Sequence, residues 1–548
     1  MSGVLTAAVA LPLFIALVMA LLRPPARRAA VAAVIASAVS FLAAVAVLVA
    51  TAVDGPTSAV VTDSDGRAVL GLAADRVGAV LITLTMLVGL VVQSFASRSL
   101  LGDPRASRFH VLSLVLTSAT ATVAVAATGS GLLIAWIVTS LALVALIGHR
   151  SPWPPAIAAQ RRTGLSFLIG DLALFLAVVA TVATIGDVDL RAVAADATAL
   201  DAEQIMGINA LTVIAVLLVV AGVARSALVP IHRWLPSTLA APTPVSALLH
   251  AGVVNGAGVL LIRFSPLFGA SATAMTLAFV LGMATALIAT AVMLVRTDVK
   301  GGLVWSTSGQ MGFMVLQLGV GAFAAALFHI VGHALYKATM FLGAGGAITT
   351  HQRQGTRPHL GEADATTLRS PIVRVLVGLA VPLVAFTLAL LVVDPHLTSS
   401  ATILIVVFGT LSIGRAANGW MGSTPFGVRR SIVTAVVGVF VGVFAYVGGL
   451  TLFENFVADV VPYDVPAAVG PVWVAATLAV IAVAVAVIVF APGTGGDALR
   501  RRTYAWLFST GTATPISPAR RRPRSAPEPA PRAATSDSPT PVTVGEPA

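Results

Sequence analysis

The chain contains no cysteine and very little charge. Only 10% of its 548 residues are charged, while 57% are hydrophobic, and soluble domains usually carry about 25% charged residues. The missing cysteine excludes disulfide bonds, thiol catalysis, iron–sulfur clusters and cysteine-based zinc sites within this sequence. A soluble fold could not hide this much apolar surface. The composition therefore predicts an all-α, polytopic membrane helix bundle in a lipid bilayer.

Lysine is almost absent as well. The sequence contains only Lys300 and Lys337, and every other basic side chain is arginine. The net charge of +11 would suit nucleic-acid binding, but the charges fall mostly in short loops and in the C-terminal tail. We therefore expect no nucleic-acid partner.

Hydrophobic runs predict a bundle of about 14–15 transmembrane helices, each close to the twenty residues that cross a bilayer. They lie near residues 3–22, 29–53, 77–97, 109–128, 130–148, 164–185, 207–228, 243–263, 272–295, 302–320, 321–348, 372–393, 400–414, 431–452 and 471–491. The first run has no cleavage site, so we expect a retained helix and not a signal peptide.

The loops between these fifteen spans alternate in charge. Basic segments lie at residues 23–28, 98–108, 149–162, 296–300, 353–359, 429–430 and 500–502, and acidic or neutral ones at 54–66, 186–203 and 454–464. The positive-inside rule then predicts a multi-pass protein of the plasma membrane, with the N-terminus outside and the C-terminus in the cytoplasm.

Four segments follow from this division. We expect N-terminal transmembrane helices over residues 1–75, a conducting core over 76–350 and C-terminal transmembrane helices over 351–491. Residues 492–548 form a cytoplasmic tail, first basic and aromatic at the membrane interface, then rich in Pro, Ala, Ser and Arg and disordered in composition.

The apolar stretch 327–346 carries three titratable side chains, His329, His333 and Lys337. Their spacing of four residues keeps them within roughly 80° on one helix face. Charged groups inside a membrane are costly and usually functional, and lysine, unlike arginine, can release its proton when it is desolvated. The stripe suits a proton relay. A polar packing face and a histidine metal site are the alternatives, and the second lacks a nearby third ligand.

A proline-interrupted helix lies next to this stretch. Four prolines interrupt residues 222–264, and Arg225, His232 and His250 flank the interruption. Irregular backbone inside a membrane is tolerated where it is buried in protein or lines a wet cavity, a frequent device at transporter ion sites. The segment is either such a site or a packing loop. Asp171 is the carboxylate placed well inside a span, and it either pairs with Arg225 or has a purely structural role.

The segment 298–313 supplies further polar groups. Asp298 and Lys300 stand at a helix entrance, and Ser308 and Gln310 follow inside the span, where such side chains bond to other helices or to water. The sequence has no phosphate-binding loop and no nucleophile constellation. We therefore expect an ion-conducting subunit and not an enzyme, with no cofactor and no metal of its own.

Three motifs carry a family resemblance. HRWLPSTLAAPTPVSALLHA at 232–251, DVKGGLVWSTSGQMGF at 298–313 and ALFHIVGHALYKATMFLGAG at 326–345 resemble the proton-conducting antiporter-like membrane subunits. That family includes the largest such subunit of respiratory complex I and the Mrp cation/proton antiporters. Within it, HAGVVNGAGVLLIRFSPLF at 250–268 looks most like DabB, the membrane subunit of DAB-type inorganic-carbon pumps.

The departures from the family pattern also separate this sequence from the complex I subunits. Ile137 follows Trp136 where the family has a glutamate, and Arg225 holds the position of a family lysine. A late family lysine is missing from residues 372–393, and residues 492–548 leave no room for the long lateral helix and additional span of complex I subunits.

The resemblance implies a membrane subunit that conducts protons or Na⁺ and energises a DabA-like zinc-binding partner. The implied relay is Lys337, His333, His329 and His250, with Arg225 and Asp171 as a charge pair. A proton-translocating subunit of a complex I-like oxidoreductase and an Mrp-type antiporter are the alternatives.

Overall fold

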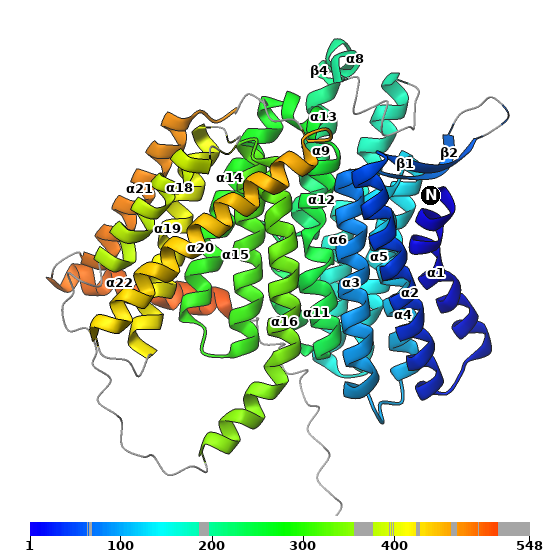
Figure 1. Ribbon diagram of the computed structural model, residues 1–548, viewed down its shortest axis with the longest axis horizontal. Helices are drawn as coiled ribbons and strands as arrows, with labels where there is room; N and C mark the ends of the chain where they lie inside the picture. The colour runs from blue at the N-terminus through cyan, green and yellow to red at the C-terminus, as the bar shows by residue number, and fades with distance from the viewer. Residues whose placement is uncertain are drawn as a thin grey trace, which may run out of the picture. The chain divides into compact units, whose positions relative to one another are not determined.

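Helices make up almost all of the structure, as predicted (Figure 1). The computed structural model describes residues 1–512 apart from residues 63, 65–67, 186–196, 356–375, 394, 396, 398, 424–427, 462–467 and 491–492. Within this part of the chain, Met1–Gly511 form one compact unit. The strands found there make only two short hairpins, so the all-α class is confirmed. The predicted disordered tail lies outside the described residues.

Six long helices form the first part of the bundle. They are α1 (Ser2–Leu22), α2 (Ala26–Val53), α3 (Arg76–Ser99), α4 (Ala106–Val125), α5 (Gly129–Ile147) and α6 (Pro154–Ile185), with a 3₁₀ turn at Gly148–Arg150. Side-chain caps fix two of the starts, because Asp75 accepts a hydrogen bond from the backbone N–H of Gly78 and Thr128 accepts one from Gly131. Such caps satisfy N–H groups that have no partner within the helix.

The helices become short and broken in the middle of the chain. The elements are α8 (Ala197–Ala202), α9 (Ala210–Arg225), α10 (Trp234–Ser237), α11 (Thr243–Ala251), α12 (Gly256–Arg263) and α13 (Ser265–Ala270), with 3₁₀ turns at Thr238–Ala240 and Val253–Asn255. The prolines between α9 and α11 remove backbone donors and prevent one continuous helix. A second interruption, at Gly252, separates α11 from α12, and the sequence did not indicate it.

Two close-packed helices follow, α14 (Ala272–Val295) and α15 (Val299–Gly319), and then α16 (Phe323–Gly355). Glycines allow the backbones of α14 and α15 to touch. A Cβ atom added at Gly282 would lie 2.5 Å from the backbone nitrogen of Leu316, and one at Gly312 would lie 2.5 Å from that of Ala286. Small residues permit this approach between membrane helices, and it packs α15 closely against α14.

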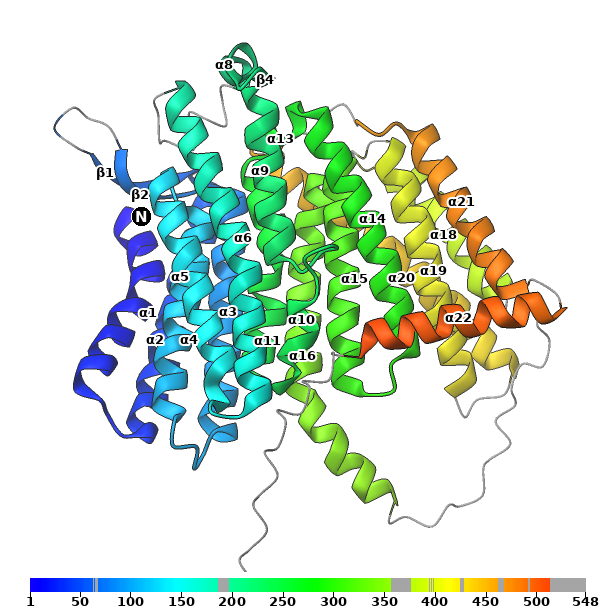
Figure 2. The same ribbon diagram turned by 180° about the vertical axis from the view of Figure 1, so that it is seen from behind.

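The C-terminal helices surround the end of this core. They are a π-helical turn at Leu376–Ala380 and the helices α18 (Val381–Val393), α19 (Ser399–Ser423), α20 (Val428–Val457), α21 (Pro471–Phe490) and α22 (Gly493–Gly511). In Figure 1, α20 slants across the bundle. In Figure 2, α22 lies across the lower ends of the other helices, and its Leu507 packs beside Val292 of α14 and Trp305 of α15.

Each of the fifteen predicted spans contains a helix. Twelve described helices are long and apolar enough to cross a membrane, and two shorter apolar helices, Ala210–Arg225 and Val377–Val393, join them. The remaining span is the more polar α15. Several predicted boundaries were wrong, and helix α19, predicted to end near residue 414, continues to Ser423. Helix α6 begins within the segment expected to be a basic loop, and α20 continues to Val457, so Glu454 is a helical residue with only 1% exposure and not part of an acidic loop.

The predicted alternation of loops is visible in the structure. The hairpins β1–β2 (Thr57–Thr62 with Ala68–Ala74) and β3–β4 (Gln204–Ile205 with Ile208–Asn209) are antiparallel. Both lie at the upper end of the bundle in Figure 1, whereas the α1–α2, α3–α4 and α14–α15 loops lie at the lower end. We call these the acidic end and the basic end.

Candidate functional site

Two of the three stripe residues on α16 are buried inside the bundle, and His329 is half-buried. The Lys337 side chain is fully buried and that of His333 is 5% exposed. The rings of His329 and His333 are stacked with their centroids 6.0 Å apart. The structure therefore brings these three predicted residues together on the face of α16 that packs against other helices.

Neutral oxygens of α15 hold the amine of Lys337. Its Nζ donates to the carbonyl oxygen of Leu303 at 3.3 Å and to the hydroxyl of Ser306. Among the described residues, no carboxylate forms an ion pair with it. An ammonium group held this way can release its proton without breaking a salt bridge, which is what a relay requires.

His333 uses both ring nitrogens. Its Nε2 lies 3.1 Å from the carbonyl oxygen of His250 on α11, and its Nδ1 lies 2.8 Å from Oε1 of Gln310 on α15. A carbonyl only accepts, so Nε2 carries a proton. The Gln310 amide can present either its oxygen or its nitrogen to Nδ1. The site thus accommodates both the neutral and the charged imidazole by rotation of one amide.

His250 lies at the end of α11, just before the interruption at Gly252. Its Nδ1 is 3.1 Å from Oγ1 of Thr307, and its ring stacks on Phe341 with centroids 4.2 Å apart. Its Nε2 is buried and has no hydrogen-bond partner among the described residues. Buried polar atoms nearly always have a partner, often a water molecule, so we expect a bound water at this nitrogen.

The predicted charge pair is present. A guanidinium nitrogen of Arg225 (α9) lies 3.0 Å from Oδ1 of Asp171 (α6), and it also donates to Oγ of Ser140 at 2.7 Å and to the carbonyl oxygen of Trp136 at 3.1 Å. The guanidinium carbon is 4.2 Å from the Trp136 ring centroid and 4.6 Å from that of Phe167. Such enclosure makes Arg225 a fixed charge.

The broken helix connects this pair to the histidines. Gly256, the first residue of α12, packs against Arg225, because a Cβ atom there would lie 2.5 Å from the Cγ atom of that arginine. The hydroxyl of Ser226, next to Arg225, accepts a hydrogen bond from the backbone N–H of Ala257 at 2.8 Å. Along the chain, one short 3₁₀ turn separates His250 at the end of α11 from Gly256, the residue that packs on Arg225.

Two of the predicted supporting residues, Asp298 and Lys300, lie at the start of α15, the helix entrance at which the sequence placed them. Asp298 caps α15 by accepting a 2.7 Å hydrogen bond from the backbone N–H of Gly301. Lys300 donates to the carbonyl oxygens of Leu239 and Ala241, at 2.7 and 2.8 Å. These contacts position α15 and the loop before α11, and none of them reaches the histidines.

The other three supporting residues, Gln310, Ser308 and His232, lie in three different parts of the structure. Gln310 belongs to the histidine cluster, as described. Ser308 donates a long 3.4 Å hydrogen bond to the carbonyl oxygen of Ala227, which ties α15 to the chain after α9. The ring of His232 lies 5.9 Å from that of Trp305, apart from the other predicted histidines.

Sequence reasoning missed a polar cluster in the loops of the basic end. The Asp103 carboxylate accepts a backbone hydrogen bond from Arg105 at 2.7 Å and lies 3.1 Å from Nε2 of His149. Burial alone would raise the pKa of the Asp103 carboxyl, but these hydrogen bonds and the nearby positive charge hold that pKa below its usual value. The two residues are 46 positions apart, so no local signal indicated the contact.

Comparisons with known proteins agree with this fold. Residues 130–413, more than half of the chain, match the family described as NADH:quinone oxidoreductase/Mrp antiporter, transmembrane. The chain is 32% identical over 396 residues to the probable inorganic carbon transporter subunit DabB1 of Halothiobacillus neapolitanus, which covers 70% of each protein. It is 33% identical over 308 residues to the probable inorganic carbon transporter subunit DabB of Bacillus subtilis, 56% of this chain and 59% of that protein.

A solved structure supports the same assignment. The chain superposes on a chain of the Mrp complex from a Dietzia species with a TM-score of 0.58 and 25% identity, over 92% of this chain and 60% of that one. The three motifs, the buried stripe and these similarities together show that the chain belongs to the NADH:quinone oxidoreductase/Mrp antiporter transmembrane family.

Proposed function

We propose that this chain is the cation-conducting membrane subunit of an energy-coupled inorganic-carbon pump. In this proposal, protons or Na⁺ flow through the chain down their gradient. The flow energises a DabA-like zinc-binding partner, which converts CO₂ to bicarbonate. The similarity to two DabB subunits supports the choice of this pump over the other members of the family.

One observation carries the conducting role, namely the hydrogen-bonded polar cluster along α15 and α16. Lys337 bonds to Ser306, and His333 bonds both to Gln310 and to the backbone of His250. In a bilayer, titratable groups that face one another inside a bundle typically mark an ion pathway.

The residues have distinct roles in the proposed pathway. Lys337 and the three histidines exchange protons, and the amide of Gln310 rotates to match the state of His333. Arg225 does not exchange protons, since a guanidinium effectively never loses its charge. With Asp171 it forms a fixed charge pair beside the broken helix.

The test is growth. Co-expression of this chain with the product of a neighbouring gene for a soluble zinc-binding protein should restore growth of a carbonic-anhydrase-deficient bacterium in ambient CO₂. The matched control replaces Lys337 with alanine and should fail to grow while inserting normally in the membrane. Absence of rescue by the wild-type pair, with both proteins present in the membrane fraction, would count against the carbon pump.

Two other functions within the family give different results. A complex I-like subunit would co-purify with flavin- and iron–sulfur-bearing proteins. An Mrp-type antiporter would generate Na⁺-dependent pH changes in vesicles. In each case we expect the basic end to face the cytoplasm, because the positive-inside rule places short basic loops there.

A further inference from the structure

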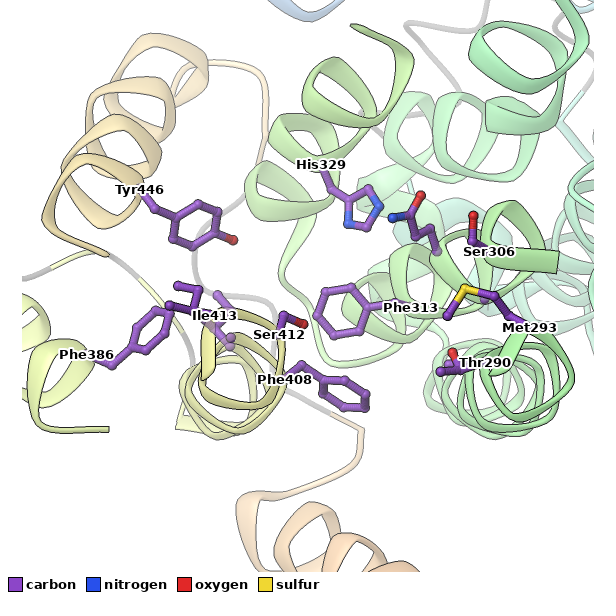
Figure 3. Close-up of a pocket in the computed structure, with 15 residues that line it drawn as sticks. Thr290, Met293, Ser306, Phe313, His329, Phe386, Phe408, Ser412, Ile413 and Tyr446 are labelled. Atoms are coloured by element: carbon purple, nitrogen blue, oxygen red, sulfur yellow. The ribbon is translucent and has the colours of Figure 1, made fainter. Parts of the chain in front are cut away.

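A cavity of about 430 Å³ lies in the first part of the bundle, between α2, α3 and α4. It is separate from the cavity shown in Figure 3, which His329 of the α16 stripe lines together with Phe313, Phe386 and Phe408. No lining residue of the first cavity belongs to α15 or α16, so the conducting role does not account for it. Its volume falls within the range of about 300–1,000 Å³ that is typical of ligand sites.

Most of the wall of this cavity is apolar and opens toward the lipid-facing surface of α2, a helix long and apolar enough to span the membrane. Val31 and Ile35, on α2, are 54% and 58% exposed. Arg27 stands in the first turn of the same helix, and the eight residues from Arg27 to Ile35 cover about 12 Å along the helix axis. The cavity is therefore a groove that follows α2 from the basic end into the apolar part of the bundle. An acyl chain fits such a groove.

Two polar groups lie in the wall of the groove at the basic end. The guanidinium of Arg27 is exposed and forms no ion pair within the part of the chain that the structure describes. The ring of His110, on α4, is 1% exposed, and its Nδ1 lies 2.6 Å from Oε1 of Gln93 on α3. This contact fixes the imidazole in the wall and leaves Nε2 as the ring nitrogen that a ligand can use.

The positive charge around this end of the groove is not balanced. Arg28, Arg98 and Arg108 stand at the ends of the same three helices, and all three are exposed. Like Arg27, they have no carboxylate partner among the described residues. The Asp103 carboxylate of the α3–α4 loop is already bound by a backbone N–H and by His149. An anion is thus the complementary partner for the basic end of the groove.

We propose that this groove binds one anionic phospholipid, with its phosphate at Arg27 and an acyl chain along α2. Basic pockets between membrane helices bind anionic headgroups, and each arginine near an anionic membrane surface contributes roughly fivefold to binding. A zwitterionic lipid would fill the apolar part equally well, but its cationic choline would be repelled by the arginines. The proposal goes beyond the carbon pump and applies whichever ion the chain conducts.

The test is native mass spectrometry of the purified full chain with phosphatidylglycerol and phosphatidylcholine at equal concentrations. We expect the wild type to retain at least fivefold more of the anionic lipid. Arg27→Ala should lose this preference for one bound lipid. The matched control is Arg502→Ala, which removes an exposed arginine of α22 that does not line the groove, and it should bind like wild type. Equal retention of the two lipids by the wild type, or an unchanged preference in Arg27→Ala, would overturn the proposal.

A second pair of variants tests the apolar part of the groove. Val34→Trp places a large ring in the wall and should lower the occupancy of phosphatidylglycerol at least fivefold while leaving every arginine in place. Leu42→Trp, two turns further along α2 at a position that is 66% exposed and does not line the groove, is its control and should bind like wild type. Wild-type occupancy in a folded Val34→Trp would mean that the lipid binds elsewhere. If Val34→Trp does not fold, Arg27→Ala decides alone, because its exposed side chain supports no packing.

Discussion

Removal of the Asp171 carboxylate should strongly destabilise the protein. Asp171→Asn keeps the shape of the side chain and leaves the buried charge of Arg225 without its counter-ion. Two unit charges about 4 Å apart interact with about 4 kcal/mol at an effective dielectric constant of 20, and breaking one side of a buried pair typically costs about 3–5 kcal/mol. Asp171 is 15% exposed, which places the expected loss near the lower end, about 3 kcal/mol.

The assay is unfolding of the purified protein by titration with sodium dodecyl sulfate, followed by circular dichroism. The matched variant is the double substitution Arg225→Met with Asp171→Leu, which removes both charges and keeps most of the apolar volume. Replacing both partners of a buried pair is often nearly neutral. We therefore expect the double variant to unfold at a higher detergent fraction than Asp171→Asn.

The two variants also separate stability from conduction. If Arg225 is a fixed charge that biases the relay, the double variant folds well and still conducts less than the wild type. A free energy of unfolding for Asp171→Asn within about 1 kcal/mol of wild type would refute the reasoning. It would mean that Ser140 and the Trp136 carbonyl alone satisfy the guanidinium.

Three further predictions concern the helix break, the basic end and the sidedness of the chain. Gly256→Ala should destabilise the protein by about 1–3 kcal/mol in the same detergent titration, since the new methyl group would lie 2.5 Å from Cγ of Arg225; an unchanged midpoint would contradict that packing. Asp103→Asn should destabilise the protein at pH 7, and this effect should disappear as the pH falls below about 4. The reason is that a carboxyl with a lowered folded-state pKa contributes stability above its unfolded pKa and loses that contribution on protonation. A difference in stability between variant and wild type that stays constant across pH would exclude the mechanism. Ser58→Cys, in β1, should react with an impermeant maleimide in intact cells, and Ser99→Cys, at the end of α3, only after permeabilisation; the reverse pattern would invert the proposed orientation.

Most of the helical architecture was predictable because a bilayer demands it. Helices must satisfy their backbone hydrogen bonds internally and span a fixed thickness, so hydrophobic runs alone located every span. The errors arose where tertiary packing extends a helix beyond its apolar run. Glu454 reads as a loop residue, yet the last turn of α20 packs against α3, with Arg76 donating a 3.1 Å hydrogen bond to the carbonyl oxygen of Phe456. Nothing local in the sequence predicts that contact.

The site residues were predictable to the same extent as the fold: features within one helix could be predicted, and contacts between helices could not. The period of the α-helix was enough to place the residues of the α16 stripe on one face, and charge complementarity was enough to predict the Arg225–Asp171 pair. The partners of these groups depend on the register between helices, which no single helix encodes. For that reason the sequence did not assign Ser306 to Lys337 or Thr307 to His250. It placed Lys300 at a helix entrance but did not indicate that its amine binds the carbonyl oxygens of Leu239 and Ala241.

The most direct measurement compares ion flux through Lys337→Ala, Lys337→Arg and the control Lys300→Arg, in vesicles that contain the complete complex and carry an imposed proton gradient. Arginine keeps the positive charge but does not release its proton. If Lys337 passes protons, both substitutions at that position reduce flux at least tenfold, whereas Lys300→Arg, which can still bind the carbonyl oxygens of Leu239 and Ala241, conducts like wild type. Wild-type flux through Lys337→Arg would show that only a fixed charge is needed there and would contradict the relay.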